Sequence, residues 1–433
     1  MDRLNIYNPY ESKETNHEDQ LTRAYLILLK YSFHAFFAFF DYCRDKFELE
    51  NKKHSLSLLE CMEKDWTIDT QRGNPEIETD YLLSILITDK NIKNESPISP
   101  SDRNARYDGI ITFGSKLTMI IENKPKSDYV WFDQLNPSKQ NLSEDTIVYE
   151  ESVVLEWKEI IKHLNSLKSV STISGYEKIM FDDFLSFVDK KFSYLNPYDY
   201  FSLCKNDKSL LGRRIENILK SIVRGSIEIK YHQGWGYYID APFEQITKIG
   251  LILYDDLGKK NDWSLGLEFH FGQTQNQARS LYNSDINISN LEMFDDCEWY
   301  PVFHVSFMST TLVTFESPSS ISIKEYTDYW INKNKKDPIC QLGRDKVKGY
   351  LDSLAKDNII VYDTDKQKEM DDVFFATERQ SLNICPEFYL VFYIPAQTAI
   401  EKDNKTGELK ELISKKIKEG LSIVNLKWEE ILK

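Results

Sequence analysis

The sequence predicts two domains, an α/β domain over residues 1–205 and an α+β domain over residues 206–433. The first observation is length, because a chain of 433 residues exceeds what one ordinary hydrophobic core accommodates. The second is order, because the first half alternates helical and strand patterns, as an α/β core with a mixed sheet does. The third is that aromatic segments of the second half alternate with polar residues, as in an antiparallel sheet.

Hydrophobic periodicity gives the elements of the first half. A long helix is expected over residues 16–42, where apolar side chains recur at helical spacing. Strands and helices complete the domain; in chain order they are strands at 66–71 and 80–88, a hairpin at 106–124, a strand at 146–149, and helices at 152–168 and 175–192.

The second half begins with a predicted helix at 208–224. Alternation predicts strands at 227–231, 235–240, 246–254, 263–271, 303–308 and 387–394. Further helices are expected at 275–282, 323–332, 343–355 and 408–431.

Composition indicates globular domains of a cytoplasmic protein. Hydrophobic residues make up 41% of the chain, which is ample for packed cores. The six cysteines are scattered without a Cys-x-x-Cys pair or zinc spacing, as is typical of reduced thiols. Residues 26–40 form the most apolar run, but Ser32 and His34 interrupt it, so we expect a buried helix and no membrane association.

The formal net charge of −15 argues against a general nucleic-acid coat protein, because phosphate contacts need clustered lysine and arginine. A nuclease is compatible with this charge, since acidic side chains can lie far from a neutral or basic cleft. Residues 205–232 carry seven basic and three acidic side chains. Arg213 and Arg214 in this stretch are candidates for phosphate contact, and the alternative is an amphipathic helix with a solvated basic face.

Residues 106–124 form a predicted β-hairpin that ends in charged side chains. Side chains alternate between the faces of a strand, so Glu122 and Lys124 share one face. With Asp108 on the facing strand, two carboxylates and one ammonium group would meet at one end of that face. Such a group suits the binding of Mg²⁺ and the activation of a water. Burial of these charges is unfavourable unless a metal or substrate uses them.

The length of the turn decides the register of this hairpin. A turn of three residues, 114–116, pairs Phe113 with Leu117 and sets Asp108 directly opposite Glu122. A turn of two residues would send the Asp108 carboxylate to the other face, because a slip of one residue inverts every side chain.

The hairpin resembles the catalytic motif of the PD-(D/E)XK nuclease superfamily, which has the restriction-endonuclease-like fold. The match consists of Asp108 followed by Glu122-Asn123-Lys124 at the end of an apolar strand. Four flanking segments resemble the branch whose motif reads IENK, namely 17–24, 133–135, 181–187 and 195–198. The resemblance covers roughly residues 14–205 and implies a mixed central sheet flanked by helices.

The resemblance implies Mg²⁺-dependent hydrolysis of phosphodiester bonds, with Mn²⁺ as a substitute. It assigns Asp108, Glu122 and the carbonyl of Asn123 to the metal, since Mg²⁺ prefers oxygen ligands. Glu18 would add a metal or water ligand from the first helix. The alternative for Glu18 is a capping box with Thr15 at the helix start.

The resemblance also gives roles to two residues beyond the metal ligands. Lys124 would orient or deprotonate the attacking water and offset charge on the pentacovalent phosphate. Gln134 would position water or a phosphate oxygen, or else only cap the following helix. Independently of the resemblance, Arg103 and Arg106 are candidates to clamp phosphate, or else to pair with Asp102 on their loop.

The leading hypothesis is therefore a nuclease that acts on double-stranded DNA, with residues 206–433 serving recognition, sensing or dimerisation. A role in defence against phage or foreign DNA rests on analogy with the family alone. A non-catalytic protein that binds nucleic acid or a partner is the second hypothesis, and an RNA-cleaving enzyme is the third. A homodimer is compatible with each. His270 and His304 are expected to be core or sheet-face histidines.

Overall fold

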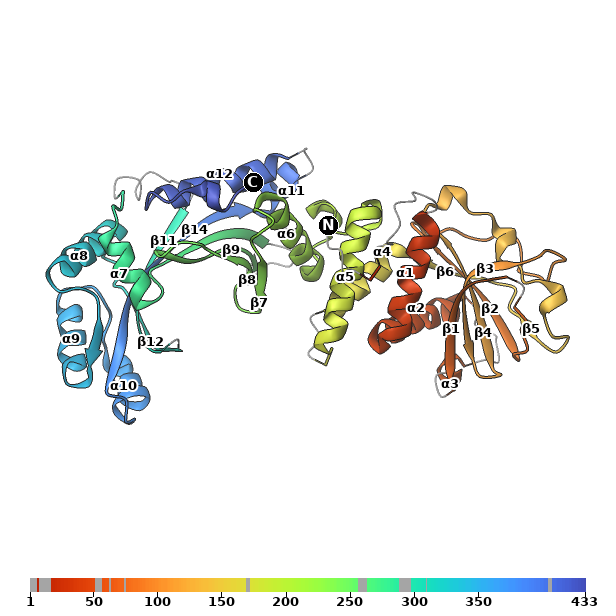
Figure 1. Cartoon of the computed structure of the whole chain (residues 1–433), viewed down its shortest axis with the longest axis horizontal. Coiled ribbons are helices and arrows are strands. Elements are labelled where there is room, and N and C mark those ends of the chain that lie inside the picture. Colours follow the sequence, from red (N-terminus) through yellow and green to blue (C-terminus); the bar gives the residue numbers. More distant parts are fainter. Residues whose placement is uncertain are drawn as a thin grey trace. The chain divides into compact units, whose positions relative to one another are not determined.

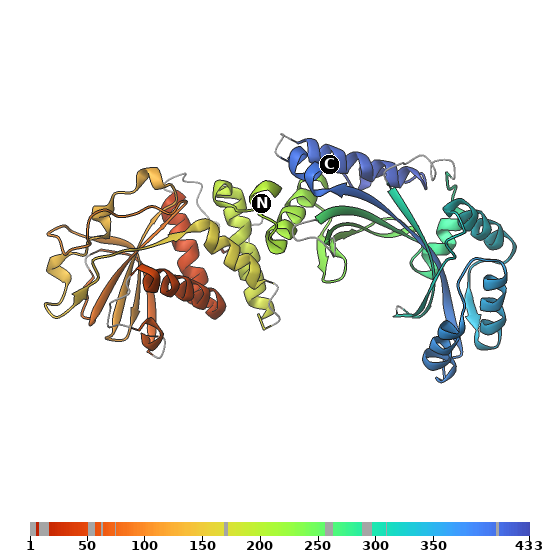
Figure 2. The same ribbon diagram turned by 180° about the vertical axis from the view of Figure 1, so that it is seen from behind.

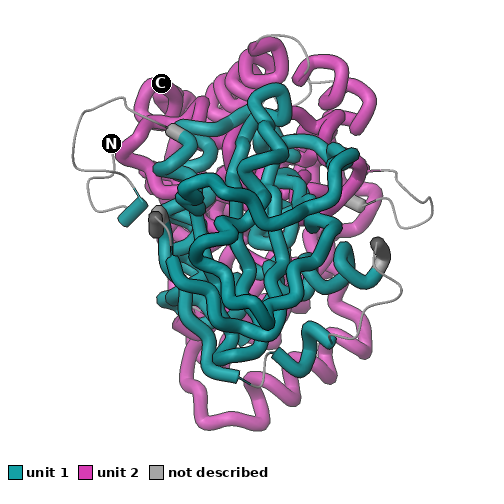
Figure 3. Tube along the Cα trace, turned by 90° about the vertical axis from the view of Figure 1, so that its right-hand side faces the viewer, with its two compact units in different colours: residues 1–199 teal, residues 200–433 magenta. Residues whose placement is uncertain are grey.

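The computed structural model describes residues 6–7, 17–50, 57–61, 64–73, 75–168, 172–255, 263–287, 297–308, 310–403 and 407–433. The chain divides into two compact units, Met1–Asp199 and Tyr200–Lys433, which Figure 3 shows in different colours. This division lies close to residue 205, where the sequence analysis sets the domain boundary.

The first unit is built on a mixed sheet with the strand order β1-β3-β4-β2-β5, and β6 also pairs with β2. Strand β3 is antiparallel to β1 and β4, whereas β2 is parallel to β4, β5 and β6. The expected α/β class with a mixed sheet is confirmed. The strands are β1 (Trp66–Gly73), β2 (Tyr81–Thr88), β3 (Arg106–Phe113), β4 (Leu117–Lys124), β5 (Ile147–Val148) and β6 (Val153–Glu156).

Long helices cover one face of this sheet, as Figures 1 and 2 show from opposite sides. Helix α1 contacts β1, β3 and β4, and α2 contacts β6. The helices of this unit are α1 (His17–Tyr31), α2 (Phe33–Glu50), α3 (Leu58–Cys61), α4 (Trp157–Leu167) and α5 (Gly175–Lys191). On the other face, the short 3-10 helix η2 (Phe132–Leu135) packs against β2 and β4.

The single helix expected at 16–42 is wrong, because the segment forms α1 and α2 with a bend of 110° between them. Ser32 lies at the break and is fully buried. Its hydroxyl accepts a hydrogen bond from the backbone N–H of Ala35 at 3.1 Å, which is the bond of an N-cap residue. Periodicity continues across the break because both helices bury apolar side chains.

The helix expected at 152–168 begins later than predicted, at Trp157. The preceding residues form β6, which pairs in parallel with β2. The β-branched residues Val153 and Val154 suit a strand, and pairing with the buried strand β2 fixes this choice.

Within the described residues, no single helix has the length and apolar character needed to span a bilayer; α1 and α2 meet these criteria only as a bent pair.

The second unit contains an antiparallel sheet with the strand order β12-β11-β14-β10-β9-β8-β7, and β13 pairs with β14. The predicted α+β character with an antiparallel sheet is confirmed. The strands are β7 (Ile229–His232), β8 (Gly236–Asp240), β9 (Ile246–Asp255), β10 (Trp263–Phe271), β11 (Cys297–Phe307), β12 (Thr310–Glu316), β13 (Gln341–Gly343) and β14 (Ser381–Pro395).

Helices lie along one face of this sheet (Figure 1). Helix α6 contacts β8 and β9, and α11 and α12 contact β10. Gly420 of α12 lies over Phe269, where a Cβ would come within 2.6 Å of the ring, so glycine permits the close approach. The helices are α6 (Lys208–Ile222), α7 (Gln275–Asn283), α8 (Ile323–Lys336), α9 (Arg344–Lys356), α10 (Thr364–Met370), α11 (Ala396–Asp403) and α12 (Glu408–Ser422).

The expectations for this unit need correction in several places, since β13, α10 and α11 are absent from the predicted elements. Strand β12 is not among the predicted elements, and β11 and β14 are longer than predicted. The terminal helix ends at Ser422, and Trp428–Glu430 forms a separate 3-10 turn. Long pairing between β11 and β14 extends both strands beyond their apolar centres.

Candidate functional site

The hairpin of β3 and β4 has the register that brings its charges together. Phe113 pairs with Leu117, and Gly109 pairs with Ile121, so the three-residue turn is confirmed. Gly114 in the turn has φ +50, in the left-handed region that favours glycine.

Because Gly109 pairs with Ile121, the next position of β3 sets Asp108 opposite Glu122, at the end of β4. Its Oδ2 accepts a hydrogen bond of 2.9 Å from the backbone N–H of Asn123. Burial raises the pKa of Asp108, and the hydrogen bond from Asn123 and the charge of Lys124 partly oppose this rise. The carboxylate is thus held against the other strand at the cost of desolvation.

The side chain of Glu122 is buried, with only 5% of its surface exposed, and it lies beside the carboxylate of Asp108. Burial, followed by repulsion from Asp108, raises the pKa of Glu122 to about 7, although Lys124 and Arg103 lower it. The buried carboxylate of Glu122 and the half-buried carboxylate of Asp108 repel each other, and a divalent cation between them would relieve both penalties.

Lys124 connects these acids to the first helix. Its Nζ lies 3.1 Å from Oε1 of Glu122 and 2.5 Å from Oε1 of Glu18. Burial would lower the pKa of Lys124, but the hydrogen bonds and charges of Glu18 and Glu122 outweigh it and raise that pKa. The side chain is therefore a fixed ammonium group.

Glu18 extends from the first turn of α1 toward the end of β4. Its carboxylate pairs with Lys124, so the residue joins the predicted site through the lysine. The alternative capping box involves Thr15, which lies outside the described residues. The contact with Lys124 uses Oε1 of Glu18, so a direct bond to a metal would fall to Oε2.

The side chain of Asn123 points to the opposite face and is fully buried. Its Nδ2 donates to Oγ1 of Thr22 at 2.8 Å, and its Oδ1 accepts from Nε1 of Trp157 at 2.9 Å. Thr22 also donates to the carbonyl oxygen of Glu18, one turn earlier in α1. These contacts hold the end of β4, the start of α1 and the start of α4 together. The sequence pattern predicted a role for the backbone carbonyl of Asn123 and none for its side chain. Thr22 lies within the segment 17–24, which resembles the nuclease branch.

Arg103 lies near Glu122 and donates a hydrogen bond to the backbone of Gln134. The guanidinium group of Arg103 donates to the backbone carbonyls of Gln134 and Asn136. Arg103 thereby holds η2 over the sheet, and its charge lowers the pKa of Glu122. Among the described contacts, none connects the Gln134 side chain to the three charged hairpin residues. Arg106, at the start of β3, is exposed.

Arg213 and Arg214 do not fit a role in phosphate contact. Arg213 is 1% exposed and its Nη1 lies 2.8 Å from Oε2 of Glu216. Arg214 binds both carboxylate oxygens of Asp403, at 3.0 and 2.6 Å. Both guanidinium groups are internal partners of acids, so their assignment to nucleic acid is wrong for this structure. The expected solvated basic face is equally wrong at these two positions.

The donor set of the hairpin suits Mg²⁺. The contacts above use one oxygen of each carboxylate, Oδ2 of Asp108 and Oε1 of Glu122. No three or more histidine, cysteine, aspartate or glutamate side chains among the described residues are arranged to hold a metal ion. Mg²⁺ needs only one or two protein carboxylates when waters and substrate phosphate complete its shell. Two carboxylates and the Asn123 carbonyl meet this requirement.

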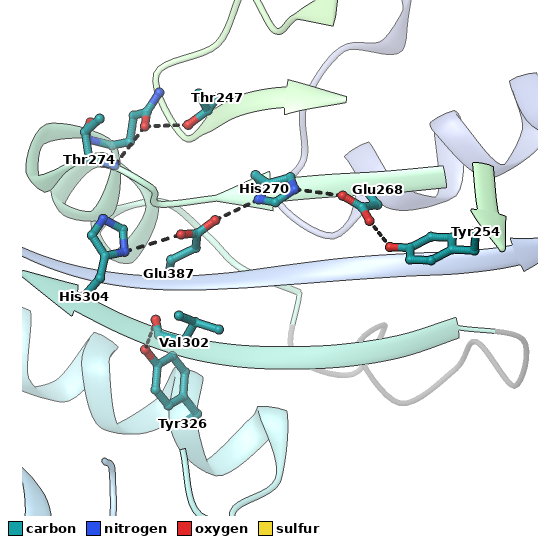
Figure 4. Close-up of polar contacts among 10 residues, drawn as sticks. Thr247, Tyr254, Glu268, His270, Thr274, Val302, His304, Tyr326 and Glu387 are labelled. Atoms are coloured by element: carbon teal, nitrogen blue, oxygen red, sulfur yellow. Dashed lines mark hydrogen bonds and ion pairs between the residues drawn. The ribbon is translucent and has the colours of Figure 1, made fainter. Parts of the chain in front are cut away.

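A second polar cluster lies on the sheet of the other unit (Figure 4). His270 contacts Glu268 at 3.0 Å through Nε2 and Glu387 at 2.9 Å through Nδ1. Glu387 also approaches Nδ1 of His304 at 3.4 Å, and Tyr254 donates to Glu268. Burial would lower the pKa of His270, but its two carboxylate partners raise it. The expected sheet-face position of His270 agrees with this arrangement.

The chain matches no protein-family model, no curated protein and no solved structure.

Proposed function

We propose that the protein is a Mg²⁺-dependent nuclease with a restriction-endonuclease-like core, and that it hydrolyses phosphodiester bonds of DNA. The observation that carries this proposal is the cluster of Asp108, Glu122 and Lys124 at one end of the hairpin. Glu122 in this cluster is buried, and Asp108 and Lys124 are half-buried. Charge placed there has no structural advantage over apolar packing, because the carboxylates lose hydration. Chemistry on an anionic substrate accounts for it.

Asp108 and Glu122 would hold the ion, with the Asn123 carbonyl beside them. When bound, Mg²⁺ lowers the pKa of a water and neutralises charge on the scissile phosphate. The hydrogen bond from the Asn123 N–H fixes the Asp108 carboxylate in place. The buried contacts of the Asn123 side chain keep the strand end rigid, as a preorganised site requires.

Lys124 would act as a cation in this reaction. Its ion pairs with Glu18 and Glu122 fix the ammonium group and favour its protonated form. A protonated lysine orients the attacking water and offsets the extra negative charge on phosphorus in the transition state. This protonation disfavours the alternative in which Lys124 accepts the proton of the water.

Cleavage assays with variants test the proposal. Lys124→Met and Asp108→Asn should each lower Mg²⁺-dependent DNA cleavage about 100-fold or more. Lys116→Met is the matched control, since Lys116 lies in the hairpin turn and pairs with Asp80. This control should cut like the wild type. Cleavage by wild type in EDTA, or unchanged cleavage by Lys124→Met, would overturn the assignment.

The substrate panel separates the competing hypotheses. Duplex DNA, single-stranded DNA and RNA are compared under the same Mg²⁺ concentration. A preference for RNA would support an RNA-cleaving enzyme, since all the hairpin chemistry is shared. Tight binding without any cleavage would support the non-catalytic alternative.

A further inference from the structure

A pocket of about 500 Å³ opens beside Lys124 in the first unit. Lys124 to Lys126 and Tyr129 form one part of its wall, and Glu18 of α1 together with the end of α5 and the residues that follow, among them Tyr194, completes it. Its volume falls in the range of sites for small ligands. Because Lys124 lines the pocket, a ligand inside it would lie next to the proposed reaction centre.

The charged side chains of the pocket favour an anion. Lys126 and Lys191 line it together with Lys124, and Glu18 is its acidic member. Glu18 is already paired with Lys124 at 2.5 Å. Within the described part of the chain, no ion pair engages Lys126 or Lys191. Two ammonium groups are therefore available to a phosphate.

Aromatic rings supply the other half of the recognition chemistry. Tyr129 is 71% exposed and Tyr194 is 44% exposed, and both line the pocket. The ammonium group of Lys126 lies 5.4 Å from the centre of the Tyr194 ring. Exposed tyrosine rings beside lysines form a surface on which a nucleic-acid base stacks while its phosphate is bound. A base within a duplex cannot use such rings, because its faces are covered by neighbouring bases.

We propose that this pocket binds an unpaired nucleotide next to the phosphate that is cut, so that single-stranded DNA or a single-stranded end is the preferred substrate. The part of this proposal that concerns the preferred substrate of cleavage rests on the proposed nuclease function. The part that concerns binding of an unpaired nucleotide rests only on the residues that line the pocket. It also departs from the double-stranded substrate expected from the sequence.

Fluorescence anisotropy of the full chain in EDTA measures binding without hydrolysis. The probes are a fluorescent oligothymidylate and a blunt-ended duplex of two fully paired strands of the same length. Wild type should bind the oligothymidylate more tightly than the duplex. Tyr194→Ala and Tyr129→Ala should each weaken binding of the single strand about tenfold, from stacking energies near 1–3 kcal/mol per base.

Conservative and distant variants separate stacking from damage to the fold. Tyr194→Phe keeps the ring and should retain single-strand binding. Tyr176→Ala changes a ring that is 65% exposed on α5 and does not line the pocket, so it should bind like the wild type. Lys126→Ala and Lys191→Ala should weaken binding and reduce its salt dependence.

The binding and cleavage experiments fail independently. If the tyrosine variants lose single-strand binding but wild type cuts no nucleic acid, the pocket stands and the nuclease proposal fails. If wild type cuts DNA but Tyr194→Ala and Tyr129→Ala bind both probes unchanged, the nuclease stands and the pocket proposal is overturned. Equal loss of duplex and single-strand binding would also overturn it, since stacking needs an unpaired base.

Discussion

At the scale of single residues, Asn123 performs two separate tasks. Its backbone N–H holds the Asp108 carboxylate, and its side chain joins Thr22 to Trp157 in the interior. The motif residue between Glu122 and Lys124 is thus a positioning residue for both neighbours. The full burial of the Asn123 side chain shows that this position does more than separate Glu122 from Lys124.

Asn123→Ala should destabilise the protein by about 3 kcal/mol, because two buried hydrogen-bonding groups lose their partner. Urea unfolding measures this change. Thr118→Ala is the control on the same strand, since it removes one buried bond, from Thr79 at 2.9 Å, and should cost about 1 kcal/mol. If both variants lost the same free energy of unfolding, the two side-chain hydrogen bonds of Asn123 would contribute no more than the single bond of Thr118.

Glu177 is a residue with a pH-dependent contribution to stability. Burial opposes its ionisation, but hydrogen bonds from His34, Ser32 and Ser174 lower its pKa to about 2. A lowered carboxyl pKa stabilises the folded state above the unfolded value of 4.5, and this contribution disappears as pH falls toward 2.

Glu177→Gln should therefore unfold more easily than wild type at pH 7, by about 2 kcal/mol, the worth of hydrogen bonds to a charged group. The difference should shrink between pH 4.5 and pH 2. Guanidinium titrations at several pH values follow it. A difference that stays constant over this range would mean that the ionised carboxylate has no such role.

At the scale of elements, strand pairing explains where the sequence patterns mislead. Val153 to Glu156 form β6 because β2 offers a parallel edge, and β11 and β14 lengthen each other. Pairing of β10 with β14 likewise brings the acids and histidine of Figure 4 from separate strands onto one face. His270 and Glu268 share β10, whereas Glu387 comes from β14.

Within this cross-strand cluster, His270 makes a contribution to stability that falls as pH rises. The raised pKa of His270 means that its proton is held more tightly in the folded state than in the unfolded state. Stability from this group is fully present below pH 6.5 and is lost as pH rises through the folded pKa. His270→Gln should therefore differ most from wild type near pH 6 and least near pH 9. Thermal unfolding across this range tests it, and a difference that grows with pH would contradict it.

At the scale of the whole molecule, two units with separate cores share one chain. The hairpin site and the pocket are formed entirely by residues of the first unit. The buried pair of Arg214 and Asp403 belongs entirely to the second, where Asp403 also accepts the N–H of Phe201.

Asp403→Asn should destabilise the second unit by about 3 kcal/mol or more, because Arg214 becomes a buried charge without a charged partner. Calorimetry of the full chain should show one transition moved to lower temperature and another unchanged. If both transitions move together, the units unfold as one cooperative body.

Local features of this protein follow from the order of its amino acids. Alternation predicted the hairpin and the shared face of Glu122 and Lys124, because these depend on neighbours in the chain. It left open whether the turn has two or three residues, and the observed register decided this. It also predicted the mixed and antiparallel character of the two sheets from the order of elements.

Only the tertiary structure decided which distant residues meet. The pairing of Glu18 with Lys124, the contacts of Asn123 with Thr22 and Trp157, and the burial of Arg213 all join separate elements. A one-dimensional pattern records that a side chain is charged or apolar, but not which partner satisfies it. Burial and pairing depend on how elements pack, and packing is a property of the folded chain as a whole.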